Sequence, residues 1–294
     1  TLDASYASIA DNCVIDQYGR IGSRKGFTAV TSSTTPLGSE SLECIKEYIN
    51  PTGANVVLSA GNAKIFTGTT TLTDATPASY TINNNNWKMV NFNDHLYIFQ
   101  LGQEPLVYSS HTGTVEKMSA HAHAAGTPPQ ANEVLAAFGR LWVADFSANK
   151  STIYWSDLLD GTKWTGGSTG SININKVWPN GLDEIVALSA HNGFLIIFGK
   201  NSIVIYQGAE DPATMSLVDT IANVGCIGRD TVQPTGTDLL FMSSEGLRSF
   251  GRTVQEKSMP VRDISKNVRT DLLVINAAQV NSPIRSIYSP EEAF

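Results

Sequence analysis

The sequence predicts an all-β protein: a β-propeller-like ring of about five, at most six, antiparallel blades. Three observations favour this fold class. A hairpin pattern recurs five times, its turn residues recur at a similar spacing, and the composition is typical of strands and tight turns. Of the 294 residues, 41% are hydrophobic and 16% are charged. This apolar content allows a proper core, and the abundance of Gly, Thr, Ser and Asn favours β-structure over long exposed helices.

Each repeat has a strand, a tight turn, a strongly apolar strand, a short polar turn and another apolar or aromatic strand. The five units cover residues 44–68, 87–110, 134–157, 184–208 and 230–252. Their first turns contain Gly53, Asp94, Gly139, Gly193 and Gly236, which lie 41 to 54 residues apart. This period is typical of one four-stranded blade, and Gly, Asn and Asp supply the backbone conformations that hairpin turns need.

The middle strand of each unit is almost continuously apolar, as in 194–198 (FLIIF). A strand that is covered on both faces by neighbouring blades has this pattern. The polar stretches between units, such as 69–84 and 168–178, are expected to supply the remaining strand of each blade. Two unrelated β-sandwiches are the alternative architecture.

The chain divides into an N-terminal hairpin segment, 1–43, and a propeller-like repeat domain, 44–294. Units begin near 44, 87, 134, 184 and 230, and a partial unit begins at 283. This last segment resembles a first strand and its turn with nothing after it, so we expect the chain to be incomplete at its C-terminus. The N-terminal hairpin is expected to pair with the last blade or with a partner subunit, because unpaired strand edges associate readily.

The charge balance argues against electrostatic capture of nucleic acid. The formal net charge is −7 and the chain contains no long basic run, whereas proteins that bind DNA phosphates need clustered Lys and Arg. The three cysteines are widely spaced and are interpreted as reduced thiols. No apolar run approaches the ~20 residues that span a bilayer, so we expect no membrane-spanning segment.

No motif of a known catalytic, cofactor-binding or metal-binding site is present, so we expect no enzyme activity, no cofactor and no metal. His121 and His123 have a spacing that occurs in metal sites, but they are interpreted as part of a linker. Residues 156–164 approximate the Asp-box of sialidase-type propellers, which is a structural turn. The densest basic patch, Arg20, Arg24 and Lys25, is either a solvated hairpin or an electrostatic docking site for a partner.

Two sequence segments resemble those of a known protein family. ADNCVIDQYGRIGSRKGF (10–27) and IYWSDLLDGTKWTGG (153–167) resemble sequences of the tail tubular, or nozzle, proteins of short-tailed bacteriophages, which are also described as packaged-DNA stabilisation proteins. The resemblance covers about two thirds of the chain. It implies a structural protein of the virion tail that is assembled in the host cytoplasm as a homohexameric ring. Portal, adaptor and other tail proteins would be its partners.

In that family the ring retains packaged DNA and conducts it during ejection without sequence-specific binding. A net negative charge fits a wall along which the duplex slides. Two alternatives stay open. One is a carbohydrate- or protein-binding propeller module, suggested by Trp142, Trp155, Trp164 and Trp178, which are expected to be exposed. The other is a sialidase-like glycosidase, which predicts Arg, Glu and Tyr clustered at the central channel.

Overall fold

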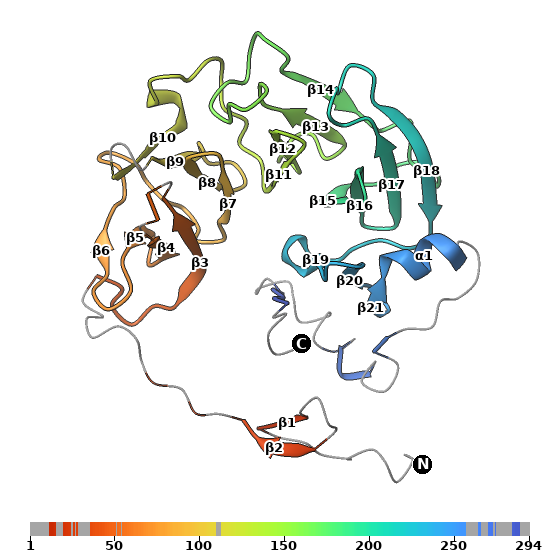
Figure 1. Ribbon diagram of the computed structural model, residues 1–294, viewed down its shortest axis with the longest axis horizontal. Helices are drawn as coiled ribbons and strands as arrows, with labels where there is room; N and C mark the ends of the chain where they lie inside the picture. The colour runs from red at the N-terminus through yellow and green to blue at the C-terminus, as the bar shows by residue number, and fades with distance from the viewer. Residues whose placement is uncertain are drawn as a thin grey trace.

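The computed structural model contains five antiparallel β-sheets that follow one another around a ring (Figure 1). We call these sheets blades 1 to 5 in chain order, and they confirm the predicted all-β propeller fold. The structure describes residues 12–15, 20–24, 26, 28, 36–50, 52–53, 55–109, 113–256, 264–265, 270–272, 274 and 284–288.

Each blade is built from strands that are consecutive in the chain. Blade 1 contains β3 (Leu42–Ile49), β4 (Asn55–Gly61), β5 (Lys64–Thr67) and β6 (Thr73–Asp74). Blade 2 contains β7 (Lys88–Phe92), β8 (His95–Phe99), β9 (Leu106–Ser109) and β10 (Thr114–Lys117), and the short 3-10 helix η1 (Met118–Ala120) follows it. Blade 3 contains β11 (Glu133–Ala137), β12 (Arg140–Ala144), β13 (Thr152–Trp155) and β14 (Gly170–Asn173).

Blade 4 contains β15 (Ile185–His191), β16 (Phe194–Gly199), β17 (Ser202–Gln207) and β18 (Ser216–Ala222). Blade 5 contains β19 (Gln233–Pro234), β20 (Leu239–Ser243) and β21 (Gly246–Ser249), with the 3-10 helix η2 (Arg229–Thr231) before it and the helix α1 (Phe250–Glu256) after it. At the N-terminus, β1 (Cys13–Ile15) and β2 (Ile21–Ser23) pair with each other in a separate two-stranded sheet.

The turns between the first two strands of each blade have the predicted backbone chemistry. In blade 2, Asn93 adopts a positive φ of 51°, and in blade 4 Gly193 adopts a φ of 79°. These left-handed conformations match the twist of a two-residue hairpin and are tolerated by Asn and Gly. The turn residues therefore set the register, for example His191 opposite Phe194.

The core lies between the blades. One buried cluster joins Trp142 of blade 3 to Leu195 of blade 4, and another joins Phe198 of blade 4 to Phe241 of blade 5. The middle strands β12 and β16 are buried almost throughout because both of their faces are covered. This burial accounts for their continuously apolar sequences.

The fifth unit differs from the sequence prediction at its end. The sequence predicts a strand through residue 252, but β21 ends at Ser249 and α1 begins at Phe250. The Phe250 ring packs against Phe198, with 6.1 Å between ring centroids. The helix turns this aromatic side chain into the core between blades 4 and 5, and burying it outweighs extending the strand.

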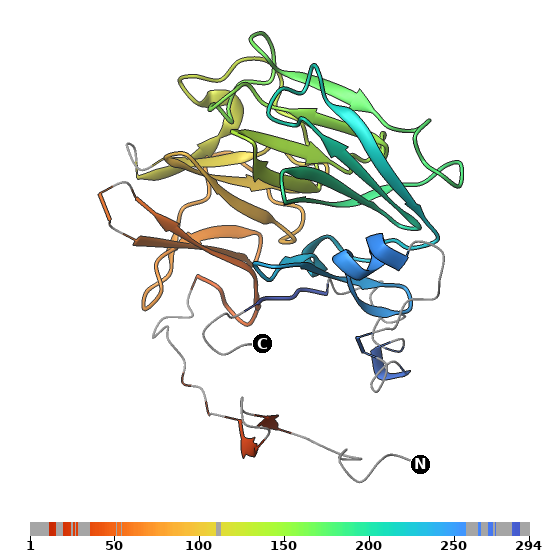
Figure 2. The same cartoon turned by 45° about the vertical axis from the view of Figure 1, so that its right-hand side comes forward.

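The β1–β2 hairpin and segment 284–288 lie on the same side of the ring, where blade 1 and blade 5 approach each other (Figure 2). The extended segment 284–288 belongs to the predicted partial unit and is joined to blade 5: Ser286 N donates to Asp230 O at 3.0 Å, and Gln233 Nε2 donates to Ser286 O at 2.7 Å. Among the described residues, no helix has the length and hydrophobicity needed to cross a membrane.

Candidate functional site

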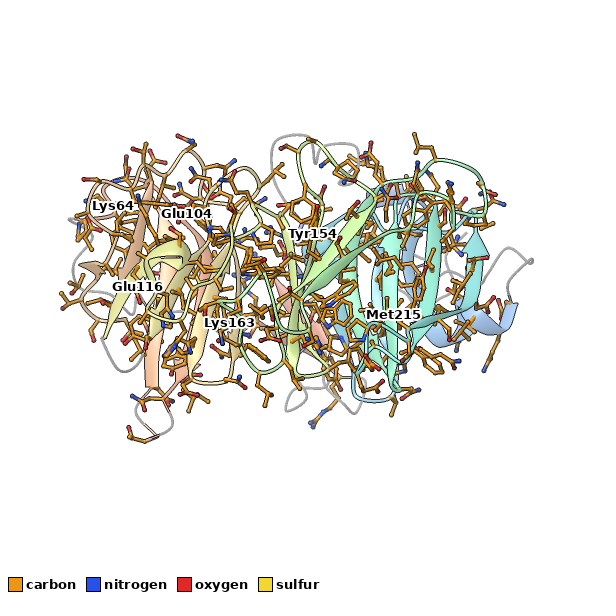
Figure 3. The ribbon with its side chains drawn as sticks, turned by 90° about the horizontal axis from the view of Figure 1, so that it is seen from above. Lys64, Glu104, Glu116, Tyr154, Lys163 and Met215 are labelled. Atoms are coloured by element: carbon orange, nitrogen blue, oxygen red, sulfur yellow. The ribbon has the colours of Figure 1, made fainter. Side chains whose placement is uncertain are left out.

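An aromatic pocket of about 410 Å³ lies on blade 3. We define the aromatic pocket by Gln130, Phe146, Asn149, Tyr154, Trp155 and Trp164. β13 supplies two of these aromatic side chains, the β12–β13 loop supplies Phe146 and Asn149, and the loop after β13 supplies Trp164. Figure 3 looks onto the outer side of blade 3, where Tyr154 is labelled. The pocket therefore combines four aromatic rings with two amide groups.

Contacts within the protein fix the aromatic rings before any ligand arrives. Trp155 Nε1 donates to the carbonyl oxygen of Ser168 at 3.0 Å, and Trp164 Nε1 lies 3.2 Å from Met118 Sδ. The rings of Phe146 and Tyr154 pack edge to face with 5.1 Å between centroids. A pocket held in this way loses little conformational entropy when it binds a ligand.

The prediction that four tryptophans are exposed is wrong for three of them. Trp142 is fully buried, and Trp155 and Trp178 are 8% and 5% exposed. They are buried because they fill the core between blades 3 and 4, where Trp142 packs on Trp155 with 5.4 Å between ring centroids. Trp164 is partly buried. The exposed aromatic ring at this site is instead Tyr154.

A second pocket, of about 630 Å³, lies where blade 2 meets the loop after β13. We call it the histidine pocket, because His95, His121 and His123 line it. The His95 and His121 rings lie 5.0 Å apart, and the His121 and His123 rings lie 5.6 Å apart. The fold thus brings a residue of β8 next to the pair that the sequence predicted to be a linker.

Carboxylates also line the histidine pocket, although the sequence placed no acidic partner near His121 and His123. They are Asp94, Glu116 and Asp160. Burial favours a higher pKa for Asp160, but hydrogen bonds from Thr162 and the nearby Lys163 outweigh it, so its pKa lies below the ordinary value. Within the described part of the chain, no three His, Cys, Asp or Glu side chains are arranged to hold a metal ion.

The centre of the ring contains a buried ion pair. Glu133 lies at the start of β11 and is fully buried. Its carboxylate accepts a hydrogen bond from Lys88 Nζ of β7 at 2.7 Å and another from the backbone N–H of Leu188 in β15 at 3.0 Å. Burial raises the pKa of Glu133, and Lys88 acts in the opposite direction. One carboxylate therefore connects the first strands of blades 2, 3 and 4.

Arg229 of η2 extends this polar centre to blade 5. Its Nη1 donates to the carbonyl oxygen of Asn132 at 2.7 Å, its Nη2 donates to Asn86 Oδ1 at 2.9 Å, and Asp230 pairs with it at 2.9 Å. Arg285 of the C-terminal segment donates to the same Asn86 oxygen at 2.9 Å. Sequence patterns did not reveal this network, because Asn86 and Asn132 lie 143 and 97 residues from Arg229 in the sequence.

The glycosidase alternative predicts Arg, Glu and Tyr at the central channel. Arg229 and Arg285 line the central pocket, and Glu133 is fully buried. In the described part of the chain, no tyrosine is among the residues that line the central pocket of about 320 Å³ next to Arg229.

The segment that approximates an Asp-box stabilises a loop. Ser156 Oγ accepts the backbone N–H of Leu141 at 3.0 Å, and Asp157 Oδ1 accepts both N–H and Oγ–H from Ser168. These bonds from Ser168 hold the pKa of Asp157 below its ordinary value. Ser156 and Asp157 thus have the structural role that the sequence predicted.

The predicted docking residues are at the N-terminal hairpin. Arg20 precedes β2, Arg24 follows it, and both are exposed. The backbone N–H of Arg24 donates to Asn12 O at 2.9 Å, which extends the β1–β2 pairing by one step. Lys25 lies outside the described residues.

No protein-family model matches this chain, and no curated protein matches it. Solved structures that are similar to it include the extracellular domain of a hybrid two-component system from B. thetaiotaomicron, with 9% identity and a TM-score of 0.46. That match covers 80% of this chain, which spans 30% of the other. Streptogramin B lyase has 12% identity and a TM-score of 0.45, and the match covers 79% of this chain and 69% of the lyase.

The WD40 domain of Neurospora crassa Pan2 has 13% identity and a TM-score of 0.44, and the match covers 71% of this chain and 60% of that domain. Likenesses at this level do not extend to the activity of this chain.

Proposed function

We propose that this chain is a non-enzymatic β-propeller module that binds carbohydrate in the aromatic pocket. The observation that carries this proposal is the combination of preformed aromatic walls with amide groups. A pyranose ring has apolar C–H faces and a rim of hydroxyl groups. The rings of Phe146, Tyr154 and Trp164 suit the faces, and the amides of Gln130 and Asn149 suit the rim.

Two measurements test the proposal: a glycan array, followed by calorimetric titration of the sugars that bind. Because each aromatic wall contributes contact area to the bound sugar, Tyr154→Ala and Trp164→Ala should each weaken binding by about tenfold or more. Leu217→Ala on β18 is the matched control, because it removes a partly exposed apolar side chain from another blade. An array without hits contradicts the proposal, as do pocket variants that bind like the wild type. Binding of a protein instead of a glycan would support the protein-binding alternative.

A ring subunit of a bacteriophage tail is the second candidate function. The N-terminal hairpin favours it, since β1 and β2 stand apart from the blades in Figure 1, and Arg20 and Arg24, which flank β2, are expected to dock on a neighbour. Because the centre of one propeller holds Arg229, Glu133 and a pocket of only about 320 Å³, DNA would pass through a lumen formed between copies.

Native mass spectrometry and electron microscopy of the purified protein test this second candidate. Six-fold rings would support it, as would portal and terminase genes next to the gene for this chain. A protein that stays monomeric at all concentrations and with tail proteins added would contradict it.

A further inference from the structure

The side of the ring between blade 1 and blade 5 carries several exposed aliphatic side chains. In the described part of the chain, the exposed isoleucines are Ile21, Ile45, Ile49, Ile264 and Ile287. One is in the hairpin, two are on β3, one follows blade 5, and one is in segment 284–288. Exposed apolar groups that concentrate in one region mark an interaction surface.

One face of β3 combines apolar and acidic side chains. Tyr48 of β3 points into the core between blades 1 and 2. Because strand side chains alternate, Ile45, Glu47 and Ile49 lie on the opposite face, where Ile45 is 66% exposed and Ile49 is 60% exposed. Glu43 is in the same strand and partly buried. We call this surface the β3 face; it is both hydrophobic and negatively charged.

The N-terminal hairpin has the complementary character. Ile21 is 66% exposed, and Arg20 and Arg24 lie on either side of β2. A two-stranded hairpin is marginally stable by itself in water, so a stable β1–β2 sheet needs a surface to pack on. In Figures 1 and 2 the hairpin stands away from β3 of its own chain.

We propose that the β1–β2 hairpin of one copy packs on the β3 face of a second copy. Ile21 contacts Ile45 and Ile49, and the Arg20 and Arg24 guanidinium groups face Glu43 and Glu47. Opposite charges steer the two surfaces together and select the register, and burial of the isoleucines supplies affinity. This contact is independent of the aromatic pocket.

Charge reversal tests the contact. Arg20→Glu/Arg24→Glu should convert assembled protein to monomer in sedimentation velocity, and Glu43→Arg/Glu47→Arg should do the same. A mixture of the two variants should assemble again, because the hairpin of each variant then meets a β3 face of opposite charge on the other variant. Lys176→Glu/Arg252→Glu is the control, since it makes the same charge change on exposed residues elsewhere, and it should assemble like the wild type. A wild type that is monomeric throughout, or reversed variants that assemble normally, would overturn the proposal.

Cross-linking identifies the copy that supplies the hairpin. In a chain with Cys13→Ser and Cys44→Ser, one variant carries Ile21→Cys and another carries Ile49→Cys, and the two have tags of different mass. Oxidation of the mixture should give a disulfide-linked heterodimer. A chain that carries both cysteines and closes the disulfide only within itself would show docking on its own β3 face and reject the second copy. Circular dichroism of each variant confirms that it is folded, so a folded pair that forms no cross-link also counts against the contact.

Discussion

Glu133 shows how much of this structure depends on one buried side chain. Its carboxylate has no exposed surface. It accepts hydrogen bonds from Lys88 of blade 2 and from the Leu188 N–H of blade 4, and so joins both blades to blade 3. Replacing a buried ion pair with apolar groups is often neutral, whereas removing one partner leaves the other charge without compensation. The pair therefore matters most through its connections between blades.

We predict that Glu133→Ala destabilises the protein by about 3–5 kcal/mol, because it leaves the Lys88 ammonium group and the Leu188 N–H without their acceptor. Urea unfolding followed by tryptophan fluorescence measures the change. The control is Asp74→Ala, which breaks the Lys64–Asp74 pair, whose side chains are both 40% exposed. It should cost at most about 1 kcal/mol. Equal losses in the two variants would contradict the role given to Glu133.

We predict that the buried thiol of Cys226 makes the stability of the protein depend on pH. Burial raises the pKa of its thiol from 9.0 to about 11. Because the folded-state pKa lies above the unfolded one, the stabilisation by Cys226 is fully present below pH 9 and is lost as the pH rises through about 11. The difference in unfolding free energy between the wild type and Cys226→Ala should therefore shrink from pH 8 to pH 10.5. A constant difference would contradict the prediction.

At the scale of the element, the blades depend on polar side chains that fix their turns. Asp183 lies before β15 and is buried. Its carboxylate accepts the backbone N–H of Asn201 at 2.9 Å and the hydroxyl of Ser202 at 2.8 Å, both at the β16–β17 turn. A side chain outside the hairpin therefore determines where this turn lies.

Asp183→Ala should destabilise blade 4 by about 1–3 kcal/mol for each buried donor that it leaves unsatisfied. Hydrogen exchange locates the effect: amides of β16 and β17 should exchange faster, while those of β8 keep their protection. Asp211→Ala, in the loop between β17 and β18, is the control because Asp211 is exposed. Faster exchange throughout the molecule would show a global effect and not a turn effect.

On the scale of the whole molecule, segment 284–288 bridges the open side of the ring. Ser286 bonds to Asp230 of η2 and to Gln233 of blade 5, and Arg285 bonds to Asn86, which precedes blade 2. Contacts of this kind join the end of a propeller to its beginning. They connect positions that are up to 199 residues apart in the sequence.

We expect Ser286→Pro to lower the unfolding temperature, because proline removes the N–H that donates to Asp230 O. The loss corresponds to about 1–3 kcal/mol. Differential scanning calorimetry measures it. Ile287→Ser is the neighbouring control, since Ile287 is 88% exposed and should change stability little. An unfolding temperature unchanged by Ser286→Pro would mean that the segment does not stabilise the ring.

Local patterns were sufficient to predict much of the fold. The Asn93 turn and the apolar run Phe194–Phe198 indicate a hairpin and a strand covered on both sides, and both are present. The same patterns failed for Trp142 and Trp178, because an aromatic residue has the same local sequence signal whether it is exposed or packed between blades. His95 and His121 are 26 positions apart, so only the fold places their rings together.

The sequence alone therefore determined the fold class and the order of the blades, since strand periodicity and turn chemistry act over a few residues. The tertiary structure decided which side chains form pockets, which carboxylate is buried at the centre and which strand face stays open. Those properties depend on contacts between distant blades. The packing of one blade on the next sets such contacts, and no local pattern records them.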